Sequence, residues 1–161
     1  MSPGRRRALV AAVAAAAVAL DQLTKAWALA ALPERPIAIL PTVRLRLTYN
    51  SGFSFGLGAE YGVVVAVVVL VIACLLARAA LREHDPVRAI IIAVVLGGAL
   101  GNIVDRVIRA DAGPLSGAVV DFVAVTWFAV FNVADMFVVC GALLLALTDL
   151  RRAPDPEPNA A

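Results

Sequence analysis

The stretch Gly62–Leu81, GVVVAVVVLVIACLLARAAL, decides the fold class of this chain of 161 residues. It carries no charge before Arg78, and its length of about 20 residues is what a helix needs to cross the hydrocarbon core of a bilayer. Three further apolar runs have similar lengths: Ala8–Leu32, Val87–Ile108 and Trp127–Leu150. We therefore predict an all-α membrane protein, a bundle of four transmembrane helices at residues 8–32, 62–81, 87–108 and 127–150.

The overall composition supports this class and excludes others. Hydrophobic residues make up 62% of the chain and charged residues 16%, with a mean hydropathy of +0.91, whereas soluble domains are about 45–50% apolar. The net charge of +2 and the lack of a long basic tract exclude nucleic acid as an expected partner. Cys74 and Cys140 lie in separate apolar runs without a Cys-x-x-Cys spacing, so we expect neither a metal site nor another cofactor.

The first apolar run has a second interpretation. The basic residues 5–7, the apolar stretch after them and small residues near Ala28 also describe a cleavable signal peptide. The apolar character continues past Asp21 and Lys25 to Leu32, however, which makes the run long enough to span. We therefore favour a retained transmembrane helix.

Basic residues beside the spans predict the orientation. Eight lie on one side: Arg5, Arg6, Arg7, Arg78, Arg82, Arg88, Arg151 and Arg152; five lie on the other: Arg35, Arg44, Arg46, Arg106 and Arg109. This bias places both termini in the cytoplasm and the loops 33–61 and 109–126 outside. Residues 1–152 are then one membrane-embedded domain, and the proline-rich residues 153–161 are a disordered cytoplasmic tail.

The first outer loop contains a strand pattern. Residues 43–49 alternate apolar and polar side chains, a period of two that predicts a strand with one apolar face. Gly52, Gly56 and Gly58 follow and indicate turns. We expect a small periplasmic or extracellular β-hairpin that rests on the membrane surface.

Ionisable residues inside predicted spans are costly and usually face a partner or a cavity. Asp21 and Lys25 are four positions apart, so they can pair on one helix face, either as a structural ion pair or as part of a site. Asn102, Asp105 and Arg106 share a face of the third span. Their pattern fits an interhelical hydrogen-bond cluster as well as a functional site.

Asp121 and Asp135 form the most informative pair of carboxylates, and Asn132 accompanies them. A continuous helix would separate the two aspartates by about 21 Å, so they meet only if the chain folds back between them. Two close carboxylates share a proton: the ionised one can deprotonate water, while the protonated one polarises a peptide carbonyl. The spacing alone leaves peptide hydrolysis, proton or cation transport, and a purely structural role open.

Five short motifs follow one another along the chain: DQLTK at 21–25, NSGFSF at 50–55, GGALGNIVDR at 97–106, VVDF at 119–122 and FNVAD at 131–135. With these motifs the chain resembles the bacterial lipoprotein signal peptidases, also called signal peptidase II, from about residue 8 to residue 150. The resemblance implies an aspartic endopeptidase that removes the signal peptide of a prolipoprotein, cutting before a cysteine that carries diacylglycerol. Asp121 and Asp135 match the catalytic aspartates of the family.

The same resemblance suggests the rest of the site. The expected supporting or substrate-binding residues are Asp21, Lys25, Asn50, Gly52, Asn102, Asp105, Arg106 and Asn132. It also implies a monomer in the bacterial cytoplasmic (inner) membrane, with its active site toward the outer leaflet. The expected partners are the lipid-modified prolipoprotein, membrane lipids and globomycin-type inhibitors. Phe53 and Ser54 depart from the family pattern, which usually has small residues there.

Overall fold

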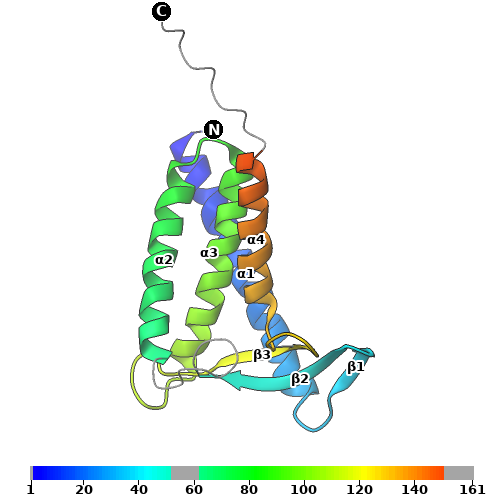
Figure 1. The fold of residues 1–161 in the computed structure, drawn as a ribbon. Helices are drawn as coiled ribbons and strands as arrows, with labels where there is room; N and C mark the ends of the chain where they lie inside the picture. The colour runs from blue at the N-terminus through cyan, green and yellow to red at the C-terminus, as the bar shows by residue number, and fades with distance from the viewer. Residues whose placement is uncertain (1, 52–61, 151–161) are drawn as a thin grey trace, which may run out of the picture.

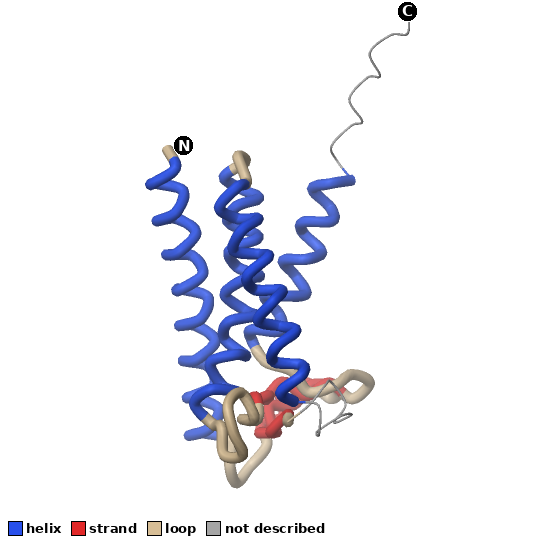
Figure 2. Tube along the Cα trace, turned by 90° about the vertical axis from the view of Figure 1, so that its left-hand side faces the viewer, coloured by secondary structure: helices blue, strands red, loops and turns tan. Residues whose placement is uncertain are grey.

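The computed structural model describes residues 2–51 and 62–150. Its elements, in chain order, are α1 (Pro3–Ala31), β1 (Ile37–Leu40), β2 (Val43–Asn50), α2 (Gly62–Arg82), α3 (Pro86–Ile108), β3 (Val119–Val125) and α4 (Val133–Leu150). Four helices run side by side, and the strands lie across one end of the bundle (Figures 1 and 2). All four helices are long and apolar enough to cross a membrane, which confirms the predicted four-helix fold.

Helix α3 is the centre of the bundle, because it contacts each of the other three helices and is the most buried of them. Its glycines allow this close approach. A Cβ added at Gly97 would lie 2.5 Å from the Ala17 Cβ of α1, and one at Gly98 would lie 2.5 Å from the Ala134 carbonyl oxygen of α4. Small residues at helix contacts are typical of membrane bundles.

The outer faces of the bundle are apolar. Val64 and Val68 on α2 and Leu143 and Leu144 on α4 are all at least half exposed. An exposed apolar surface of this extent would be unfavourable in water and is the normal lipid-facing surface of a membrane protein. The chain is therefore a multi-pass membrane protein. Helix α1 reaches Pro3, before the predicted start at Ala8, because Ser2 caps it and the basic residues 5–7 continue the helix.

The sheet has three antiparallel strands in the order β1-β2-β3. The hairpin of β1 and β2 confirms the predicted hairpin in the loop 33–61, but the partner of β2 precedes it in the chain. The glycines 52, 56 and 58, which were expected to form its turns, lie outside the described residues. Strand β3 comes from the loop 109–126, for which no strand was predicted, and it pairs with β2.

A register shift in β2 places Asn50 on the inner face of the sheet. Before the shift, Leu45 is half-buried and its neighbours Arg44 and Arg46 are exposed. Strict alternation would then turn Asn50 outward, because side chains change face at every residue. The shift between Leu45 and Thr48 in the pairing with β3 reverses this parity, so that Asn50 faces the bundle.

The predicted start of the fourth span at Trp127 is wrong. Helix α4 begins at Val133, and Trp127 lies in the turn after β3 with 79% of its surface exposed. A helix that began at Trp127 would place Asp135 about 12 Å along its axis, at 1.5 Å per residue. Asp135 instead lies in the first turn of α4. Apolar composition led to this error because an aromatic turn at the end of a bundle has the same hydropathy as a helix.

Candidate active site

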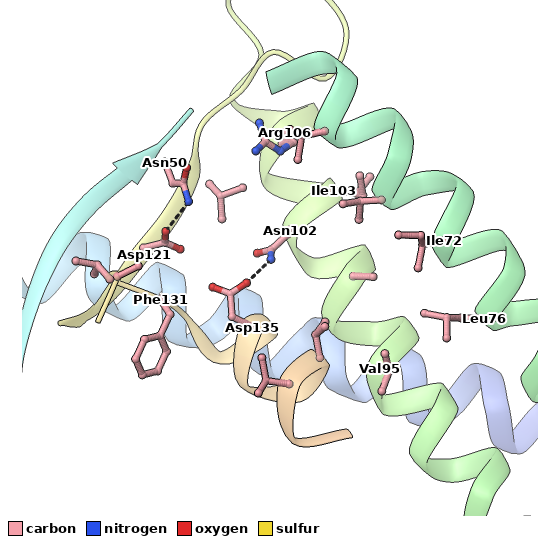
Figure 3. Close-up of a pocket in the computed structure, with 18 of the residues that line it drawn as sticks. Asn50, Ile72, Leu76, Val95, Asn102, Ile103, Arg106, Asp121, Phe131 and Asp135 are labelled. Carbon is pink, nitrogen blue, oxygen red and sulfur yellow. Dashed lines mark hydrogen bonds between the residues drawn. The ribbon is translucent and has the colours of Figure 1, made fainter. Parts of the chain in front are cut away.

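Asp121 and Asp135 come from two elements that the chain brings together by turning back. Asp121 is in the middle of β3, and Asp135 is the third residue of α4. Phe131 pairs with Val123 in antiparallel fashion: the Val123 N–H donates to the Phe131 carbonyl at 2.8 Å, and the Phe131 N–H donates back at 3.0 Å. The return that the spacing required is therefore present, and both carboxylates line one cavity (Figure 3).

Asn132 contacts both aspartates and also caps α4. Its side-chain Nδ2 donates to Asp121 Oδ1 at 2.7 Å, and its backbone N–H donates to Asp135 Oδ2 at 3.1 Å. In return, the Asp135 backbone N–H donates to Asn132 Oδ1 at 3.0 Å. This reciprocal pair is a variant of the helix capping box, in which the first residue before a helix and its third residue satisfy each other's N–H groups.

Asn102 on α3 connects this pair to a buried cation. Its Nδ2 donates to Asp135 Oδ1 at 2.8 Å (Figure 3). Its Oδ1 accepts from Asn132 Nδ2 at 3.1 Å and from Lys25 Nζ at 2.9 Å. The Lys25 side chain on α1 is fully buried, so it reaches the site only through Asn102 and its ion-pair partners.

Asp21 and Asp105 neutralise Lys25 and also bind the backbone of the two elements that carry the aspartates. Lys25 Nζ lies 2.8 Å from Asp21 and 2.9 Å from Asp105. The other oxygen of Asp21 accepts the Ala134 N–H of α4 at 3.0 Å, and Asp105 accepts the Val120 N–H of β3 at 3.0 Å. The ion pair of Asp21 and Lys25 and the group around the two aspartates are therefore one hydrogen-bonded network, not alternatives.

Gln22 belongs to this network, although it is not among the site residues predicted from the sequence. Its side-chain amide donates to Asp21 at 3.1 Å, to the Gly101 carbonyl at 3.1 Å and to Asp105 at 3.3 Å. A polar residue next to Asp21 in an otherwise apolar span was the available signal, because amides in such spans usually have partners on a neighbouring helix.

Asn50 and Arg106 complete the side of the site that faces the sheet. Asn50 Nδ2 donates to Asp121 Oδ2 at 3.1 Å, so each oxygen of Asp121 accepts one amide hydrogen bond. Arg106 is buried, and its guanidinium donates to the carbonyls of Ser51 at 3.5 Å and Gly117 at 3.4 Å. The remaining predicted site residue, Gly52, lies outside the described residues, as do Phe53 and Ser54.

The cavity beside the aspartates has a volume of about 370 Å³ and is mostly apolar. Polar atoms from Asn50, Asn102, Arg106, Asp121 and Asp135 line it at the sheet end, and Figure 3 shows their side chains directed to one space. Apolar side chains from α2, α3 and α4 line the rest, including Val69, Ile72, Leu76, Val95 and Val139. Such a cavity can hold an apolar chain and present one polar group to the aspartates.

The electrostatics of Asp121 suit a carboxyl group that holds a proton. Burial raises the pKa of Asp121 to about 7, and the nearby charge of Asp135 adds to the increase. The hydrogen bonds from Asn50 and Asn132 oppose it, because they stabilise the ionised form. Near neutral pH, protonated Asp121 can therefore donate a proton that an ordinary aspartate would have lost.

The chain is similar to known proteins in both sequence and fold. The family model described as signal peptidase (SPase) II matches residues 13–151. The chain is 40% identical to a lipoprotein signal peptidase of Streptomyces coelicolor, covering 95% of this chain and 75% of the relative. It is 41% identical to one of Mycobacterium avium, covering 92% and 82% respectively. A solved structure described as a bacterial membrane enzyme superposes with a TM-score of 0.73 at 22% identity, covering 92% of this chain and 94% of that one.

Fold and family together define a multi-pass membrane enzyme of the aspartic endopeptidase class. The chain belongs to the signal peptidase II family, because the family model covers nearly its whole length. This membership decides between the alternatives that the carboxylate spacing left open, and it selects peptide hydrolysis over transport.

Proposed function

We propose that this protein removes the signal peptide from diacylglyceryl-modified bacterial prolipoproteins, cutting before the lipid-modified cysteine, and that Asp121 and Asp135 activate the attacking water. The observation that supports this most directly is the arrangement of the two carboxylates around Asn132 at the polar end of an apolar cavity. The relatives named as lipoprotein signal peptidases support the substrate class.

The proposed chemistry needs only the aspartates and water. The ionised carboxylate takes a proton from water as the oxygen attacks the scissile carbonyl carbon, while the protonated carboxyl donates a hydrogen bond to the carbonyl oxygen. The tetrahedral intermediate then breaks its C–N bond as the leaving amine receives a proton from the pair. No covalent enzyme intermediate forms, and the pair returns to its singly protonated state.

The other polar residues support the pair in different ways. Asn50, Asn102 and Asn132 donate hydrogen bonds to the two carboxylates. Asp21, Lys25 and Asp105 fix the helices and β3 relative to one another, and Arg106 holds the segments around Ser51 and Gly117. Gly52 remains a family-based expectation, because it lies outside the described residues.

The membrane setting follows from the same proposal. Both termini of the bundle lie at the end opposite the sheet (Figure 1), and the basic bias assigns that end to the cytoplasm. The aspartates then lie near the outer face of the cytoplasmic membrane, where water reaches them and where the lipid anchor of a prolipoprotein would be held. A monomer contains every residue of the proposed site. Globomycin-type inhibitors are expected to compete with the substrate for the cavity.

Cleavage of a synthetic prolipoprotein segment with a diacylglyceryl-cysteine tests the proposal. We expect Asp121→Asn and Asp135→Asn each to lower kcat by about 1000-fold or more, because each variant keeps the shape but removes the shareable proton. Asp111→Asn makes the same chemical change on an exposed outer loop and should retain full activity. Normal turnover by either site variant, or equal cleavage of the unlipidated segment, would contradict the proposal.

A further inference from the structure

Lys25 is a fully buried cation that the hydrolytic chemistry does not use directly. Its ammonium has three hydrogens and three partners: Asp21 at 2.8 Å, Asp105 at 2.9 Å and the Asn102 Oδ1 at 2.9 Å. The two carboxylates already neutralise the ammonium. The third contact, to the Asn102 amide, therefore needs its own explanation, because this amide also donates to Asp135.

The contact with Lys25 determines which way the Asn102 amide points. An ammonium group can only donate hydrogen bonds, so the Asn102 atom that faces it must be the carbonyl oxygen. The Nδ2 group must then point to the opposite side, where it donates to Asp135 Oδ1 at 2.8 Å. An amide turned the other way would place its N–H groups against the ammonium and its oxygen against a carboxylate.

The Asn132 amide is oriented by the same logic. Its Oδ1 accepts the backbone N–H of Asp135, so its Nδ2 must face Asn102 Oδ1 and Asp121 Oδ1. Lys25 and the Asp135 N–H therefore fix the directions of the hydrogen bonds that Asn102 and Asn132 donate to the aspartates. Reversing one amide would leave a donor facing a donor in a buried setting, which is costly.

The two aspartates receive unequal support for a negative charge. Asp135 lies in the first turn of α4, where the helix dipole favours an anion. It accepts the backbone N–H of Asn132 and a side-chain N–H of Asn102. The oxygen of that Asn102 amide is bound to the Lys25 ammonium, which strengthens the amide as a donor. Asp121 lies on a strand, is only 2% exposed and accepts two side-chain amides. Burial also raises the pKa of Asp121 to about 7, in agreement with this difference.

We propose, on the basis of the peptidase function above, that Lys25 is a positioning residue: by orienting Asn102 it keeps Asp135 as the ionised base, so that the shared proton of the resting enzyme lies on Asp121. Asp121 is then the acid that polarises the scissile carbonyl, and Asp135 deprotonates the water. The charged groups around the pair are Asp21 and Lys25 from α1 and Asp105, Arg106 and Arg109 from α3. Lys25 makes a hydrogen bond to the Asn102 amide, which in turn donates to Asp135.

A carboxyl titration of the unmodified enzyme gives the first test. Protein labelled with carbon-13 at the aspartate carboxyls is titrated in detergent micelles, and the resonances are assigned with Asp121→Asn and Asp135→Asn. At about pH 6 we expect the Asp121 resonance at the position of a protonated carboxyl and the Asp135 resonance at that of a carboxylate. The reverse assignment overturns the proposal, and this measurement needs no variant of Lys25.

The second test removes the cation together with one of its counter-charges. In the pair Lys25→Met with Asp21→Asn, the new amide oxygen at position 21 can still accept the Ala134 N–H, and Asp105 keeps Arg109 at 3.5 Å. The matched control is Arg88→Met with Asp149→Asn, which removes the ion pairs of Arg88 with Asp149 and with Glu83 at the opposite end of the bundle. Both pairs leave the net charge unchanged.

The readout is the pH profile of kcat on the diacylglyceryl-cysteine segment. Without the nearby cation, ionised carboxylates are less stable, so both limbs of the profile should move to higher pH by about one unit, and kcat at neutral pH should fall about tenfold. KM should change little, and the control pair should keep the wild-type profile. A folded Lys25 variant with lowered kcat but an unmoved profile assigns Lys25 a structural role only and refutes the proposal. Failure of the peptidase function would instead appear as normal turnover by the aspartate variants.

Discussion

Gly98 on α3 offers a sharp test of how helix packing controls the geometry of the proposed catalytic aspartates. A Cβ added there would lie 2.5 Å from the Ala134 carbonyl oxygen and 3.1 Å from Phe137 and Val138, all on α4. Restoring an ordinary contact of 3.4 Å requires α4 to move by about 0.9 Å, the difference between the two distances. Because Asp135 follows Ala134 directly, this movement would shift it relative to Asn102 and Asp121.

Gly98→Ala is therefore expected to lower kcat by about 100-fold, the typical effect of misplacing a reacting group by about 1 Å. Overpacking should cost about 1–3 kcal/mol of stability, partly offset by the gain of about 0.5–1 kcal/mol from replacing a helical glycine. The assay compares initial cleavage rates and thermal unfolding in detergent with Gly4→Ala, whose added Cβ would have no neighbour within 4 Å. A Gly98→Ala enzyme within about twofold of wild-type kcat would refute the claim that this contact sets the aspartate geometry.

Three other predictions concern single residues of the site. Burial, and then the charge of Asp135, raise the pKa of Asp121 to about 7. The rate of cleavage should therefore decline as the pH rises through about 7 and Asp121 loses its proton. A cleavage rate that stays level up to about pH 9 would contradict this prediction. Asp21→Ala should lower stability by about 3–5 kcal/mol, as measured by thermal unfolding, because it leaves Lys25 with one carboxylate and Ala134 without its acceptor. Asn132→Ser should preserve stability within about 1 kcal/mol, since serine also caps helices, but should lower kcat about 10- to 100-fold because no amide then joins Asp121 to Asn102.

The number of spans could be predicted from the sequence because hydropathy and length are local properties. The limits of α2 and α3 differ from the predicted ones by one residue at most. The need for a return between Asp121 and Asp135 was also predictable, because helix rise fixes how far apart fourteen residues can be. The identity of the substrate was not predictable this way, since carboxylate pairs in membranes serve transport as well as hydrolysis.

Strand β3 and the start of α4 were harder to predict, for a physical reason. The segment Val119–Val125 becomes a strand because β2 offers it an edge, and that pairing joins residues about 70 positions apart, such as Asn50 and Val119. A short apolar run carries no periodicity that separates a buried strand from a helix. The inward orientation of Asn50 depends on a register shift in the same pairing, which likewise has no local signature in residues 43–50.

The start of α4, in contrast, had a signal that the hydropathy obscured. Asn132 and Asp135 have the spacing of a capping box, and this spacing identifies a helix start better than the apolar residues from Trp127 onward. The same two residues carry the proposed chemistry. Three N–H groups at the start of α4 have no partner within the helix, and these are the N–H groups of Asn132, Ala134 and Asp135. They donate to the Asp135 carboxylate, to Asp21 and to the Asn132 side chain, respectively. Helix initiation and placement of Asp135 therefore use one set of hydrogen bonds. A substitution that moves the first turn of α4 must also move Asp135. Stability and activity should therefore separate in variants that retain the cap but change the groups around the aspartates, as Asn132→Ser does by removing the amide.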